Sequence, residues 1–141
     1  NFRMSSGIVG RLWTSSVAIG RQHGFDIQVF GEKGGLKWFS EQPNQLLFSK
    51  IGHRTEIIEK GENNLHEDAS RLSRVAIAHP EGFPLAVANI YVDIASAING
   101  DMRTNLPTAS DGLRSMAAVY AATESAKNNG QWVDARPLMF R

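Results

Sequence analysis

The chain has 141 residues, of which 42% are hydrophobic and 21% charged, and its formal net charge is +1 at pH 7. This composition is that of an ordinary globular domain and excludes a disordered or fibrous chain. Lysines and arginines are spread along the sequence and matched by acidic residues, so no basic stripe predicts a nucleic-acid partner. No apolar run approaches the roughly 20 residues of a membrane helix, so we expect no membrane association.

The sequence contains no cysteine. Thiolate nucleophiles, cysteine zinc sites and disulfide scaffolds are therefore excluded, and the composition fits a cytoplasmic protein. A chain of this length buries roughly 68–70% of the surface that its unfolded form exposes. We therefore expect a single domain that needs neither a metal nor a disulfide to form its core.

The first part of the chain has the alternating pattern of β-strands. Residues 8–19 alternate, with Val9, Trp13, Val17 and Ile19 on one face and Ile8, Leu12 and Ala18 on the other. The apolar runs 25–30 and 36–39 flank the glycine-rich residues 31–35. A short glycine-rich interval between two such runs predicts a β-hairpin.

Two further strands are expected at residues 45–50 and 53–60, with turns at residues 41–44 and 51–52. The first 60 residues are therefore predicted to form five or six antiparallel strands. In several of them both faces carry apolar side chains. Phe30 and Phe39, for example, have the opposite parity to Ile27, Val29, Leu36 and Trp38.

Beyond residue 65 the apolar period changes to that of α-helices, after a polar segment that has room for one short helix. The first long helix is predicted to begin between Pro80 and Pro84, because prolines are tolerated in a first turn, and to end at Asn99-Gly100. A second is predicted to begin after Thr108, with Asp111 completing a capping box, and to end at residues 128–130. We expect an α+β fold, with an open, mainly antiparallel sheet and helices packed on one face.

The sequence contains none of the common nucleotide, zinc-protease or serine-hydrolase motifs. A phosphate cradle needs a helix N-terminus after its glycines, whereas residues 31–35 precede a predicted strand. His66, Glu67 and Asp68 are sequence neighbours that do not face one another on a helix, which favours a solvated loop over a metal site. No metal ligand and no cofactor-binding residue is predicted in this chain.

His79 lies where the first long helix is expected to begin, with Glu81 two residues further on. Imidazole can transfer protons near neutral pH, and a helix N-terminus favours its neutral form. We name His79, Glu81 and the loop residue His23 as candidate substrate-binding residues. The alternative for His79 is a purely structural role as a cap or turn residue at the start of the helix.

Three segments resemble, in this order, the C-terminal domain of the Gfo/Idh/MocA oxidoreductases. They are "FDIQVFGEKGGLKWFSEQPNQLLFS", "HPEGFPLAVANIYVDIASAI" and "LPTASDGLRSMAAVYAATESAKNNGQWV", and the resemblance covers about residues 7–133. It implies a two-domain enzyme. An N-terminal Rossmann domain holds NAD or NADP, and the C-terminal domain supplies an open sheet, the substrate wall and the subunit contact.

The resemblance makes residues 1–141 the C-terminal substrate-binding and oligomerisation domain alone. The dinucleotide-binding domain, the family's Glu-Lys-Pro motif and its Asp/His pair are expected upstream. Glu32 and Lys33 are followed by Gly34 and not by proline, so no catalytic residue is assigned here. We expect a piece of a longer NAD(P)-dependent oxidoreductase that acts on a sugar, polyol or related hydroxy compound, with no cofactor bound by this chain.

Two other functions remain open. One is a free-standing α+β module that binds a small ligand, and the other is a dimerisation module without catalysis. Helices can cover only one face of a sheet, so an apolar second face predicts a subunit contact. We therefore expect a homodimer or tetramer formed through the open sheet face.

Overall fold

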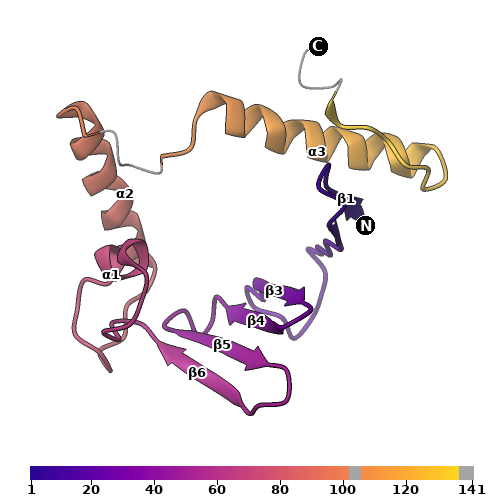
Figure 1. Ribbon diagram of the computed structural model, residues 1–141. Helices are drawn as coiled ribbons and strands as arrows, with labels where there is room; N and C mark the ends of the chain where they lie inside the picture. The colour runs from indigo at the N-terminus through magenta and orange to yellow at the C-terminus, as the bar shows by residue number, and fades with distance from the viewer. Residues whose placement is uncertain (102–105, 137–141) are drawn as a thin grey trace. The chain divides into compact units, whose positions relative to one another are not determined.

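The computed structural model describes residues 1–101 and 106–136. The chain divides into two compact units, Asn1–Phe83 and Pro84–Arg141. The elements, labelled in Figure 1 except for β2, are β1 (Phe2–Arg3), β2 (Val9–Gly10), β3 (Asp26–Gly31), β4 (Gly34–Phe39), β5 (Gln45–Lys50), β6 (Thr55–Glu59), α1 (Glu67–Leu72), α2 (Phe83–Ile98) and α3 (Ala109–Lys127). The α+β class is as predicted.

The first unit contains a four-stranded antiparallel sheet in which β3, β4, β5 and β6 are neighbours in chain order. The predicted hairpin is confirmed, because Gly31 pairs with Gly34 and leaves a two-residue turn between β3 and β4. Glycine is needed at position 34, where a β-carbon would collide with the carbonyl oxygen of Ser49 on β5. The strands therefore approach closely at this end of the sheet.

The strand register gives the sheet two different faces. One face is almost entirely apolar and carries Ile27, Val29, Leu36, Trp38, Leu46, Phe48 and Ile58. The other carries Phe30, Phe39, Leu47 and Ile57 among polar side chains such as Gln28, Lys37, Gln45 and Glu59. We call this second side of the sheet the mixed face. Its apolar side chains confirm the prediction that both faces of the sheet carry apolar residues.

The prediction of a long strand at residues 8–19 is wrong. Only Val9–Gly10 is a strand, and it pairs with Phe2–Arg3 in a separate two-stranded sheet. Alternation determines where side chains would point, but a strand also needs a partner for its backbone hydrogen bonds. Trp13 and Ile19 lie in neither strand nor helix and are exposed.

All of the predicted helices are present in the described residues. His66 is the N-cap of α1 and not a loop residue, since its Nδ1 accepts the amide hydrogen of Asp68 at 3.3 Å. α2 ends at Ile98 and is followed by Gly100 at φ 87, the left-handed conformation expected of the stop signal. None of the helices in the described ranges is long and apolar enough to cross a membrane.

The predicted capping box opens α3. The amide of Asp111 donates to the hydroxyl of Thr108 at 3.3 Å, and the amide of Thr108 donates to the carboxylate of Asp111 at 2.8 Å. These bonds satisfy backbone donors that the first helical turn leaves without partners. The helix then continues to Lys127 and buries Ala117 and Ala121.

Thr108→Ala should destabilise α3 by about 1 kcal/mol, because it removes the side chain that accepts the Asp111 amide. Urea unfolding followed by far-ultraviolet circular dichroism would measure the change. Ser110→Ala, in the same helical turn, is the matched control and should change stability by less than about 0.5 kcal/mol. Equal losses in the two variants would contradict a specific capping role.

Candidate functional site

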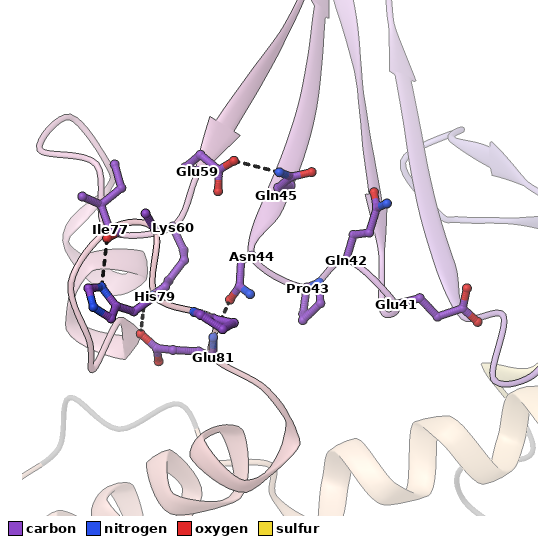
Figure 2. A pocket seen from close by; sticks show the side chains of 12 residues that line it. Glu41, Gln42, Pro43, Asn44, Gln45, Glu59, Lys60, Ile77, His79 and Glu81 are labelled. Carbon is purple, nitrogen blue, oxygen red and sulfur yellow. Dashed lines mark hydrogen bonds and ion pairs between the residues drawn. The ribbon is translucent and has the colours of Figure 1, made fainter.

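A cleft of about 750 Å³ lies where several strand ends meet in the first unit (Figure 2). β4 ends and β5 begins on either side of residues 40–44, and β6 ends beside the start of β5, where Glu59 pairs with Gln45. Residues 41–45, 59–60 and 77–81 line the cleft. Segments far apart in the sequence therefore meet at one end of the strands.

An ion pair between Lys60 and Glu81 joins the end of β6 to the segment that precedes α2. The Nζ–Oε1 distance is 2.6 Å, and the two side chains are only 14% and 11% exposed. A salt bridge with so little solvent around it is weakly screened, unlike a pair on the open surface. It therefore fixes the position of residues 74–81 against the sheet.

The Glu81 carboxylate also accepts backbone hydrogen bonds. Oε1 accepts from the amides of Arg74 at 2.8 Å and Val75 at 2.9 Å, and Oε2 accepts from Arg74 at 3.1 Å. Burial by itself raises the pKa of Glu81, but the hydrogen bonds from Lys60, Val75 and Arg74 and the charge of Lys60 outweigh it and lower the pKa from its ordinary value. The folded chain therefore stabilises the ionised carboxylate.

Lys60 and Asn44 complete this network. Lys60 Nζ donates to the carbonyl oxygens of Val75 at 2.8 Å and Ala76 at 3.2 Å. The side-chain oxygen of Asn44 accepts the amide of Glu81 at 3.1 Å, and its backbone carbonyl accepts the amide of Lys60 at 2.8 Å. We call Asn44, Lys60 and Glu81 the clamp, because they hold both ends of residues 74–81.

His79 lies between the two ends that the clamp holds and lines the cleft. Its Nδ1 is 3.2 Å from the carbonyl oxygen of Ile77, which can only accept, so Nδ1 carries the proton and donates. The preceding residue, Ala78, has φ 66, in the left-handed region that residues with a side chain avoid. α2 begins at Phe83, so the expected roles of His79 as helix cap or dipole-stabilised imidazole are wrong. The other structural alternative, a turn residue, agrees with the structure, since the amide of His79 donates to the carbonyl oxygen of Ala76 at 3.1 Å.

The other side chains of the cleft are mostly amides and carboxylates. Gln45 Nε2 donates to Glu59 at 2.7 Å, and Glu41 accepts the amide of Gly24 at 2.9 Å. This last bond ties the cleft wall to the segment that contains His23, but His23 is not among the lining residues. Of the three candidates, the structure thus brings His79 and Glu81 together and leaves His23 outside.

The sequence did not point to Lys60, Asn44, Gln45 or Glu59. Their partners lie far along the chain, at separations of 21 residues for Lys60 and Glu81 and 37 for Asn44 and Glu81. The one usable signal was position, since Asn44 directly precedes one predicted strand and Lys60 is the last residue of the other. Within residues 1–101 and 106–136, no group of three or more histidine, aspartate or glutamate side chains is arranged to hold a metal ion.

Residues 2–135 match the profile of the Gfo/Idh/MocA family, described as "Oxidoreductase family, C-terminal alpha/beta domain". The chain belongs to this family. The resemblance drawn from the three sequence segments is therefore confirmed, and the chain is an oxidoreductase C-terminal domain.

Individual relatives agree with this assignment. The uncharacterized oxidoreductase YfiI of Bacillus subtilis strain 168 is 29% identical over 137 residues, covering 92% of this chain and 35% of that protein. Two crystal structures superpose on the chain with TM-scores of 0.81. One is an oxidoreductase from Sinorhizobium meliloti, which is 36% identical, and the match covers 85% of this chain and 35% of that one. The other is an inositol dehydrogenase homolog complexed with NAD+ from Azotobacter vinelandii, which is 33% identical, and the match covers 86% of this chain and 33% of that one. The chain thus spans about a third of the length of these relatives.

In this Gfo/Idh/MocA domain, Glu81→Gln should lower the free energy of unfolding at pH 7 by about 2 kcal/mol, because it removes the charge that pairs with Lys60. The pKa of Glu81 is lowered by folding, so its contribution is present above the unfolded pKa of about 4.3 and is lost as the pH falls through the folded value. The difference between wild type and variant should be constant from pH 7 to about 5 and shrink below about 4. Urea titrations across this range would measure it.

Glu56→Gln is the matched control, since it makes the same substitution at an exposed glutamate, on β6. Its effect should stay below about 0.5 kcal/mol at every pH. A Glu81→Gln difference that did not change between pH 7 and pH 3 would contradict the charge-based account.

Proposed function

We propose that this chain is the substrate-contacting and subunit-contacting domain of a NAD- or NADP-dependent dehydrogenase that acts on a polyol, sugar or related hydroxy compound. The observation that carries the proposal is family membership over residues 2–135, together with 33% identity to an inositol dehydrogenase homolog complexed with NAD+. The chain covers only 33% of that relative. The activity is therefore proposed for a longer protein that contains this domain.

The dinucleotide is assigned to the rest of that protein. Binding a pyrophosphate requires a glycine-rich turn that leads from a strand into a helix N-terminus. The glycine-rich residues 31–35 instead connect and begin antiparallel strands. β6 is followed by α1, but the intervening residues 60–66 contain the single glycine Gly61, and so do not form a glycine-rich turn. The described residues therefore do not fit the cofactor.

The cleft supports a hydroxylated substrate. Its lining provides amide groups from Gln42, Asn44 and Gln45, a carboxylate from Glu59 and an imidazole from His79. Such neutral and acidic groups can donate to and accept from hydroxyl groups, whereas the lysine of the cleft is already paired with Glu81. This chemistry fits a neutral polyhydroxy compound better than an anionic one.

Two measurements test the proposal. The longer protein should form NADH or NADPH, followed by absorbance, with at least one member of a panel of inositols, sugars and sugar alcohols. The 141-residue chain alone should show no saturable micromolar binding of NAD or NADP by calorimetry, because it lacks the pyrophosphate site. Tight dinucleotide binding by this chain, or a longer protein inactive on the whole panel, would favour a free-standing binding or dimerisation module instead.

We also propose that the mixed face of the sheet contacts a second copy of the chain. Apolar side chains that a sheet face leaves in water mark a surface that a partner can cover. Phe30 and Ile57 on the mixed face are 82% and 57% exposed. The same face carries Lys37 as well as Asp26, so two copies related by a two-fold axis can pair opposite charges around apolar contacts.

Light scattering at micromolar concentration should therefore give the mass of a dimer or tetramer for this chain. Phe30→Glu should shift it to monomer, since a carboxylate would be buried at the contact. Gln28→Glu introduces the same charge nearby on the same face and should dissociate the assembly much less. If the parent chain is monomeric, or if both variants behave identically, the mixed face does not contact a second copy. Another part of the longer protein would then cover it.

A further inference from the structure

We propose that Asn44, Lys60 and Glu81 are positioning residues that hold His79 in the cleft with its Nε2 as the hydrogen-bond acceptor for a ligand hydroxyl group. The hydroxylated ligand rests on the proposed function. The positioning itself is argued from the geometry of the first unit alone.

The two charged residues of the clamp are engaged with each other and with the backbone. An ammonium group has three donors, and those of Lys60 are directed at Glu81 Oε1 and the carbonyl oxygens of Val75 and Ala76. The Glu81 carboxylate accepts from Lys60 and from the amides of Arg74 and Val75. Lys60 and Glu81 therefore act on a ligand only through the backbone that they hold.

The backbone between the clamped ends is strained beside His79. Ala78 has φ 66, a left-handed conformation that is unfavourable for a residue with a side chain. Such a conformation persists only where surrounding contacts determine it, and it is found preferentially at ligand-binding sites. Here the contacts are the clamp and the close packing of Ile77 on Gly61, where a β-carbon would be 3.4 Å from the amide nitrogen of Ile77.

This conformation determines which nitrogen of His79 can meet a ligand. Nδ1 donates to the carbonyl oxygen of Ile77, so a neutral imidazole has its acceptor at Nε2. No hydrogen bond occupies Nε2 within the described residues, and the side chain is exposed and lines the cleft (Figure 2). A hydroxyl group of a bound polyol can donate to it. Glu81, which the sequence suggested as a ligand contact, is therefore a residue that positions the ligand contact His79.

The first experiment needs only this chain. Nitrogen-15 spectra of the imidazoles at pH 8, above the ordinary histidine pKa of about 6.5, distinguish the two neutral tautomers. His79 should be mainly the Nδ1–H form in the wild type. Lys60→Met, and the milder Asn44→Ala, should move it towards the Nε2–H form that an unconstrained imidazole prefers.

Two other histidines are internal controls. His53 Nδ1 lies 3.0 Å from the carbonyl oxygen of Ile51 outside the clamp, and His66 Nδ1 accepts from Asp68. His53 should keep Nδ1–H and His66 should keep Nε2–H in every variant, while backbone amide spectra confirm that the variants are folded. A His79 tautomer that is unchanged in both clamp variants overturns the positioning role, whatever the longer protein catalyses.

The second experiment uses the longer protein and its hydroxylated substrate. His79→Ala should raise KM about 3- to 10-fold with kcat nearly unchanged, as expected for the loss of one hydrogen bond made equally in the ground and transition states. Lys60→Met should raise KM in the same range. The double variant should be no worse than His79→Ala alone, because the clamp acts through His79.

Glu56→Gln serves as the control for loss of a charge on β6 and should leave both constants unchanged. Additive effects of Lys60→Met and His79→Ala, or an unchanged KM in His79→Ala, overturn the inference. A longer protein that oxidises no hydroxy compound contradicts the proposed function instead, and the tautomer spectra then decide the clamp independently.

Discussion

The register of the β3–β4 hairpin is the constraint on which the described arrangement of the first unit depends. Gly31 pairs with Gly34 across a two-residue turn, and Gly34 cannot carry a side chain because β5 passes too closely. A slip of one residue would send every side chain of the slipped strand to the opposite face. With the observed register, Leu36, Trp38, Leu46, Phe48 and Ile58 share one face. The end of β4, the start of β5 and the end of β6 come together at the same end of the sheet.

The ends of these strands form a binding cleft only because residues 74–81 are fixed against them. Lys60 follows β6 directly, and its pair with Glu81 anchors residues 74–81 at the strand ends. An ion pair this poorly exposed gains little net stability over an apolar contact, but breaking one partner leaves the other charge uncompensated. Its main effect is thus specificity of placement: it selects one backbone path, with Ala78 left-handed and His79 facing the cleft.

Local signals predicted most of the secondary structure, and their failures share one cause. The glycine-rich hairpin, the Asn99-Gly100 stop and the Thr108 capping box each depend on residues within a few positions of one another, so the sequence displays them directly. Residues 8–19 have an equally good strand pattern, but no alternation of side chains specifies which backbone will pair with it. The clamp escaped prediction for the same reason, because its contacts join residues 21 and 37 positions apart and no motif relates them.

Ligand binding and self-association can use different parts of the same strands. A sheet packs on partners through its faces, where side chains alternate, whereas a cleft at the strand ends is built from the turns that follow and precede the strands. Phe30 and Ile57 lie on the mixed face and are not among the cleft residues, which are 41–45, 59–60 and 77–81. Gln45 and Glu59, at the strand ends, belong to both surfaces. Contact of a second copy with the mixed face would therefore stiffen the sheet that supports the clamp and leave the His79 acceptor accessible. The Lys60–Glu81 pair connects β6 to the segment that carries His79. A stiffer sheet would therefore hold His79 more firmly in its ligand-binding position.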